Sequence, residues 1–142
     1  MKRYSGVCIC VSFVLILFSG QVFAHHGGAS YWIMDSRVGP VTGIATKLGF
    51  TFPHVSIYLE IADEWGKVEE YMMSIRWTPT VLRKLGWNRK TIKPGDELTV
   101  TYIPHKQKAT VGALVRLKVN GKTVAIAPPE LEKELDVRSE IK

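Results

Sequence analysis

The sequence predicts an all-β domain with one short helix, folded as a five-stranded antiparallel barrel; a small antiparallel sandwich is the alternative. Three observations predict this class: apolar and polar residues alternate over five segments, recognisable turn sequences separate several of them, and one stretch carries helix signals. Hydrophobic residues are 46% of the 142 positions and charged residues 23%, so the chain can form one core. This composition excludes a globally disordered protein.

The strands are expected where the hydrophobic pattern has a period of two. The clearest case is 55–62, in which every second residue is a branched apolar one, so one face of the strand should meet the core. Gly43 lies inside the first segment, where a glycine predicts a bulge or a bend. A short returning strand is expected at the end, over 122–126. The five main segments are 41–48, 55–62, 69–75, 98–102 and 113–119.

The connections between these strands have characteristic turn sequences. A hairpin turn is predicted at 63–66, a type II turn at Pro94-Gly95, and a type I′ turn at Asn120-Gly121. One helix is expected over 78–87, because Thr78 suits the N-cap, Pro79 the first helical position and Gly86 the end of the helix.

The order of elements, three strands, a helix and two strands, is that of the OB-fold, a small barrel whose closure removes exposed strand edges. The expected organisation is a signal peptide at 1–24, an N-terminal segment at 25–39, the OB-like barrel at 40–127 and a charged tail at 128–142.

The first 24 residues have the layout of a secretory signal peptide. Lys2-Arg3 precede the apolar run 7–18, and small residues precede a cut after Ala24. Retention as a membrane anchor is the alternative, although the apolar stretch is short for a spanning helix. Cleavage predicts a periplasmic or secreted protein, removes Cys8 and Cys10 with the signal, and lowers the formal charge from +6 to +4. The mature chain then has no disulfide and no thiolate site.

Several short motifs follow one another in a characteristic order along the chain. They are His25-His26 after the signal, the segment 53–59 entering a strand, 66–69 in the hairpin, Leu85-Gly86-Trp87, the segment 92–100, and Asn120-Gly121-Lys122. In this order they resemble the DUF6152 family, small exported bacterial proteins whose biochemical role is not established. The chain departs from the family pattern at Phe52, where an asparagine is usual, and at 74–77, which lacks an expected acidic residue. Both departures weaken the transfer of a polar pocket to either place.

The leading functional hypothesis is a transition-metal site, most simply for copper, in a noncatalytic periplasmic binding module. Cleavage would make His25 the first residue, so its amine and imidazole could chelate one metal beside His26. His54 is the expected third ligand because Pro53 holds the backbone at the start of a strand, and the resemblance implies a histidine there. His105, flanked by lysines, is expected at the surface and far from His54. The alternative is that the N-terminal histidines bind nothing and His54 hydrogen-bonds a neighbouring loop.

The second hypothesis is a metal-free envelope module that binds a small ligand, a glycan or a protein partner through loop aromatics and basic surface. Trp65 at a hairpin tip and Trp77 after the third strand are the candidate ligand-binding residues, with packing as the alternative for both. Trp87 is expected to pack back on the helix before it. Export argues against nucleic acid as a partner. No catalytic motif was found, and adjacent carboxylates along a strand point to opposite faces, so an enzyme is the less favoured reading.

The copper hypothesis predicts that one extra alanine before His25 abolishes copper binding through the chelate of the terminal amine with the first imidazole. The insertion moves the free amine away from the first imidazole and so breaks the chelate, while it leaves every side chain of the barrel unchanged. Copper titration of the mature protein and of this variant measures the difference. Equally weak binding in both would remove the hypothesis.

Overall fold

The computed structural model describes residues 28–131. A one-turn helix, α2 (Gly28–Tyr31), opens the described chain, and the described residues 31–131 belong to one compact unit. Within the described range no helix has the length and apolarity needed to cross a bilayer. The predicted signal peptide and the end of the charged tail lie outside the described residues.

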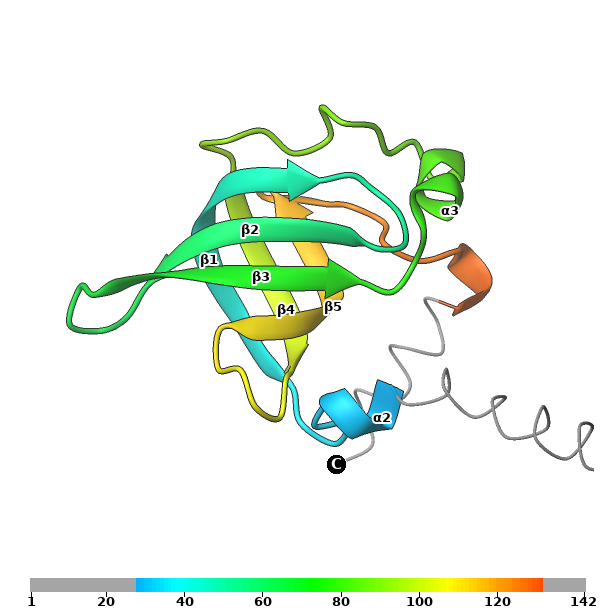
Figure 1. The fold of residues 1–142 in the computed structure, drawn as a ribbon. Coiled ribbons are helices and arrows are strands. Elements are labelled where there is room, and N and C mark those ends of the chain that lie inside the picture. The colour runs from blue at the N-terminus through cyan, green and yellow to red at the C-terminus, as the bar shows by residue number, and fades with distance from the viewer. Residues whose placement is uncertain (1–27, 132–142) are drawn as a thin grey trace, which may run out of the picture. The chain divides into compact units, whose positions relative to one another are not determined.

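The five predicted strands and the predicted helix are all present (Figure 1). The first strand is longer than expected, whereas the helix is shorter and the returning strand is reduced to two residues. The elements are β1 (Val38–Gly49), β2 (Val55–Ala62), β3 (Val68–Ile75), α3 (Pro79–Lys84), β4 (Glu97–Pro104), β5 (Val111–Val119) and β6 (Lys122–Thr123).

The strands close into the predicted five-stranded barrel. Their order is β3-β2-β1-β4-β5, with β6 added beside β5, and β3 and β5 pair to complete the ring. The closing pair is parallel, from Met72 opposite Val111 to Ser74 opposite Ala113, so the barrel is mixed, with antiparallel pairing between its other strands. A ring of five strands cannot alternate direction all the way round, and one like-directed pair is therefore unavoidable. The sandwich alternative is excluded by the closure.

β1 holds the barrel together by changing its partner halfway along. Its first part pairs with β4 as far as Ile44, and its second part pairs with β2 from Ile44 to Gly49. Gly43 lies next to this change, and a Cβ there would stand 2.4 Å from the carbonyl oxygen of Glu60. Gly43 therefore allows two backbones to approach closely, whereas the register irregularities lie on either side of it, at 38–41 and 45–47.

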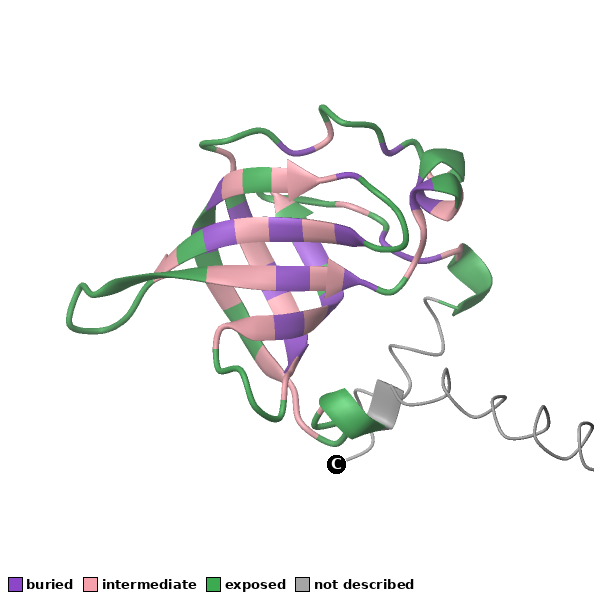
Figure 2. Ribbon diagram, in the orientation of Figure 1, coloured by how far each residue is buried: buried purple, intermediate pink, exposed green. Residues whose placement is uncertain are grey.

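The core lies inside the ring and follows the predicted alternation. In β2 the residues Val55, Ile57 and Leu59 have no exposed surface, and the residues between them are partly exposed (Figure 2). At about 25 cal/mol per Å² of apolar area removed from water, this burial is the main favourable term in folding. The largest side chains that are almost fully buried come from four strands and the helix: Ile57, Leu59, Met73, Ile75, Leu82, Leu98 and Leu117.

The predicted turns have the backbone geometry that their sequences require. Gly95 has φ +91° and the Asp96 N–H donates to the Lys93 carbonyl at 3.1 Å, as in a type II turn. Asn120 and Gly121 have φ of 50° and 78°, the two left-handed residues of a type I′ turn. These local sequence signals were therefore sufficient to predict the two turns.

The parallel seam depends on a glycine at the start of β5. A Cβ on Gly112 would lie 2.3 Å from the ring of Tyr102 and 2.9 Å from the sulfur of Met73, so no side chain fits between them. The missing side chain allows the buried Tyr102 ring to pack across the seam.

We expect Gly112→Ala to lower the free energy of unfolding by about 1–3 kcal/mol, the usual cost of overpacking a core. Gly49→Ala is the matched control, because the nearest atom to a Cβ there is at an ordinary 3.5 Å. Urea denaturation of the two variants measures the difference. Equal stability in both would show that the seam can open to accept a methyl group.

Candidate functional site

One end of the barrel is covered by α3 and by the loop that follows it, residues 85–96 (Figure 1). The helix begins at Pro79 and ends before Gly86, whose φ of +88° turns the chain. Leu82, Trp87 and Ile92 point into the core and are almost fully buried. The Trp87 ring N–H donates to the Ala125 carbonyl at 2.8 Å, which confirms the expected packing of this residue and attaches the cover to the C-terminal segment.

The outer side of this cover is strongly basic. From residue 71 to residue 95 the sequence has six basic residues and no acidic residue. All six side chains are exposed, and none forms an ion pair with a carboxylate of residues 28–131. We call the outer side of the cover, together with the β1–β2 loop beside it, the end surface: Phe52, Arg83, Lys84, Arg89, Lys90 and Lys93.

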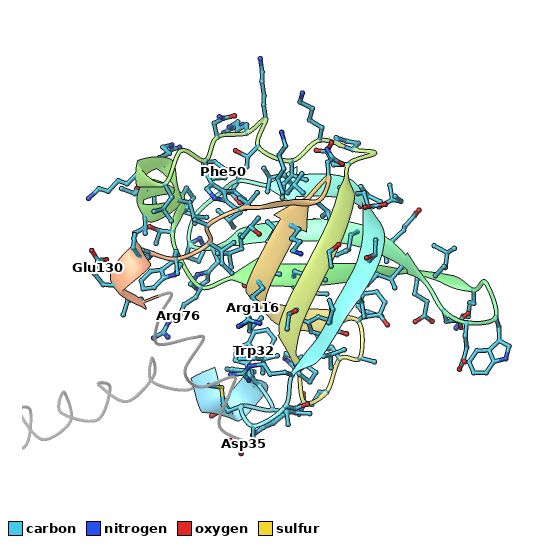
Figure 3. All side chains as sticks on the ribbon, turned by 180° about the vertical axis from the view of Figure 1, so that it is seen from behind. Trp32, Asp35, Phe50, Arg76, Arg116 and Glu130 are labelled. Atoms are coloured by element: carbon cyan, nitrogen blue, oxygen red, sulfur yellow. The ribbon has the colours of Figure 1, made fainter. Side chains whose placement is uncertain are left out.

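The β1–β2 loop, residues 50–54, contributes an aromatic side chain to the end surface. The Arg83 guanidinium lies 5.3 Å from the centre of the buried Phe50 ring, a cation–π contact that joins the loop to α3. Phe52, two residues on, is 64% exposed. The loop that carries this exposed ring is therefore joined to the basic helix through Phe50, whose position Figure 3 shows from behind.

Acidic residues gather at the other end of β3. The β2–β3 hairpin projects from the barrel (Figure 1) and carries Asp63, Glu64, Glu69 and Glu70, all exposed, against one lysine. That lysine, Lys67, pairs with Glu69 at 2.6 Å, and this hydrogen bond and charge raise its pKa. The charges of the barrel are thus separated along β3, negative at the hairpin and positive at α3.

Asp96 marks the edge of the end surface. Its carboxylate accepts hydrogen bonds from the Asn120 side-chain amide at 3.0 Å and from the Lys93 backbone N–H at 2.7 Å. Both bonds favour the charged form, and the pKa of Asp96 is lowered, mainly by Asn120. The Asp96 side chain therefore serves the turn in which it lies, where it fixes the covering loop to the β5–β6 turn.

The histidines predicted as metal ligands are only partly described. His25 and His26 lie outside residues 28–131. His54 is exposed on the β1–β2 loop, and its ring makes no hydrogen bond to the described part of the chain. Within residues 28–131, no three His, Cys, Asp or Glu side chains are grouped so that they could hold a metal ion.

His105 lies at the opposite end of β1 from His54, as the sequence predicted. It follows β4, whose last residues pair with the start of β1, whereas His54 follows the end of β1. Trp32 forms a β-bridge with His105, and the two rings meet edge to face at 5.3 Å. The Nδ1 atom of His105 accepts a hydrogen bond from the Gln107 N–H at 3.0 Å, so this nitrogen has a structural role.

The two tryptophans proposed as one ligand-binding set are not together. Trp65 is 82% exposed at the hairpin tip, whereas Trp77 follows the other end of β3. Trp77 is half-buried against the core, and the Arg76 guanidinium lies 5.8 Å from the centre of its ring. Each could contact a partner, but not the same small ligand.

Sequence reasoning missed the end surface. Its signal was the absence of acidic residues from 71 to 95, a charge pattern and not a hydrophobic period. A run of cations spread over a helix and a loop is ordinarily read as solvated surface. Only the fold shows that these residues lie on one side of one cover.

The fold and this surface define a small OB-type barrel with a basic, aromatic-bearing end. A family model described as a family of unknown function (DUF6152) matches residues 14–114, and the chain belongs to this family. No curated protein and no solved structure matches the chain.

The different burial of Trp65 and Trp77 predicts different losses in the free energy of unfolding when each is replaced by alanine. Trp65→Ala should change the free energy of unfolding by less than about 0.5 kcal/mol, as is usual for an exposed residue. Trp77→Ala should cost about 1–3 kcal/mol because part of its ring packs on the core. Urea denaturation separates the two, and a large loss for Trp65→Ala would mean that the hairpin tip is held against the barrel.

Proposed function

We propose that this protein is an exported, noncatalytic binding module that holds an anionic partner on the end surface of its barrel. The observation that carries the proposal is the separation of charge along β3, which leaves exposed cations at the α3 end that form no ion pair with a carboxylate of the described residues. Export rests on the signal peptide that the sequence predicts. Cations gathered on one face attract anionic groups and speed association with them.

The geometry favours binding at a surface. The cover beneath the cations is fixed by buried Leu82, Trp87 and Ile92, so the basic side chains extend from a firmly packed base. Their chemistry suits phosphate, sulfate or carboxylate groups, with arginine able to bind two oxygens at once. No proton donor or nucleophile is required for this role.

Copper binding by the predicted mature N-terminus is a second candidate. The observation that favours it is the exposure of the His54 ring, which makes no hydrogen bond to residues 28–131 and thus has its nitrogens available to a metal. Its test is the alanine insertion described above.

We expect Arg89→Glu/Lys90→Glu to weaken retention of the mature protein on heparin, used as a soluble polyanion, on the order of tenfold, because two attractive contacts become repulsive. Retention of the unchanged protein should fall steeply between about 50 and about 500 mM salt. Salt-dependent binding isotherms measure both effects.

The matched control is Lys106→Glu/Lys108→Glu, which makes the same change of net charge on the β4–β5 loop. This loop follows the end of β4, whereas the covering loop leads into its start, so the two pairs lie at opposite ends of the strand. Equal weakening in both variants would show that binding reflects net charge alone, and the end surface would not be a site.

A further inference from the structure

We propose that the anionic partner is the surface of a phospholipid bilayer, against which the end surface lies with Phe52 entering the headgroup region. This inference rests on the proposed function and specifies its partner. Three features of the described chain favour a bilayer over a soluble anionic ligand: an exposed aromatic ring among the cations, the spread of the cations over a broad cover, and the position of the acidic hairpin.

The aromatic ring is the first feature. Phe52 is 64% exposed at a loop tip, although phenylalanine has no polar group to place in water. The Arg83 guanidinium lies 5.3 Å from the centre of the Phe50 ring in the same loop, and this contact joins the loop to the basic helix. Apolar side chains bounded by lysine and arginine are the arrangement of proteins that lie in the interface of a membrane.

The distribution of the cations is the second feature. Arg83 and Lys84 lie at the end of α3, Arg89 and Lys90 follow in the turn after it, and Lys93 lies near β4. They extend along the whole cover and do not converge on one point. A flat anionic sheet meets all of them at once, and the attraction of each adds to that of the others.

The acidic hairpin is the third feature. Glu69 and Glu70 lie at the start of β3 and Glu64 lies in the turn before it, whereas Arg76 follows the other end of β3. An anionic bilayer attracts the α3 end and repels the hairpin, which selects a single orientation. A soluble polyanion is attracted to the same basic end, but only a planar surface fixes how the whole barrel lies against it.

The experiment is sedimentation of the mature protein with vesicles of phosphatidylcholine that contain about one third phosphatidylglycerol, compared with pure phosphatidylcholine. We expect binding to the anionic vesicles alone. Arg89→Glu/Lys90→Glu should reduce the apparent partition coefficient on the order of tenfold or more, and Lys106→Glu/Lys108→Glu should change it by less than about twofold.

Phe52→Ser separates the bilayer from other polyanions. It should lower binding to anionic vesicles about threefold or more while leaving retention on heparin unchanged, because only the bilayer offers an apolar interface. Thermal unfolding of each variant establishes that the barrel is intact. An equal effect of Phe52→Ser on both probes would overturn the proposed insertion.

The two proposals can fail separately. If the protein binds heparin through Arg89 and Lys90 but ignores anionic vesicles, the partner is a soluble polyanion; the bilayer inference is then wrong and the proposed function stands. If neither probe is bound, both are wrong. If both double variants lose vesicle binding equally, the attraction is that of the net charge, and again neither proposal survives.

Discussion

The parallel pairing of β3 with β5 is the interaction on which the rest of the structure depends. It turns a sheet with two open edges into a ring and places Met73, Ile75 and Leu117 in one enclosed core. The close contact of Gly112 with Tyr102 shows how little room this seam has. Once the ring is closed, its ends are the places where loops must cover exposed apolar side chains, and the α3 segment is the cover at one of them.

The cover explains why charge could accumulate at one place. Its inner side is set by the core, which accepts Leu82, Trp87 and Ile92 and rejects polar groups. Its outer side has no packing to satisfy, so basic residues can occupy it at little cost in stability. Function and folding thus use opposite sides of one segment.

Most of the fold could be predicted because its signals are local. The alternation in 55–62 and the Asn120-Gly121 dipeptide each determine a structure within a few residues. The start of β1 could not be predicted, because Gly39-Pro40 is unfavourable in a strand. Only the pairing of Val38 with the distant Tyr102 makes this segment part of the strand. The parallel direction of the β3–β5 pair follows from the odd number of strands in the ring, although no sequence pattern indicates it.

The site was less predictable than the fold for a physical reason. Histidines and tryptophans draw attention as single residues. The predicted third strand already separates Trp65 from Trp77, but no local pattern indicates that Trp65 is exposed while Trp77 packs on the core. The end surface, in contrast, consists of common surface residues. They form a candidate site only because the fold brings them together.

The burial of the tryptophans also makes this barrel its own spectroscopic reporter. Trp87 is sealed in the core and Trp65 is almost wholly in water, while Trp77 lies beneath Arg76 near the basic end. Emission from the hairpin tip is therefore open to a dissolved quencher such as iodide, and emission from Trp87 is shielded. Quenching of tryptophan emission can thus separate the exposed hairpin tip from the shielded core.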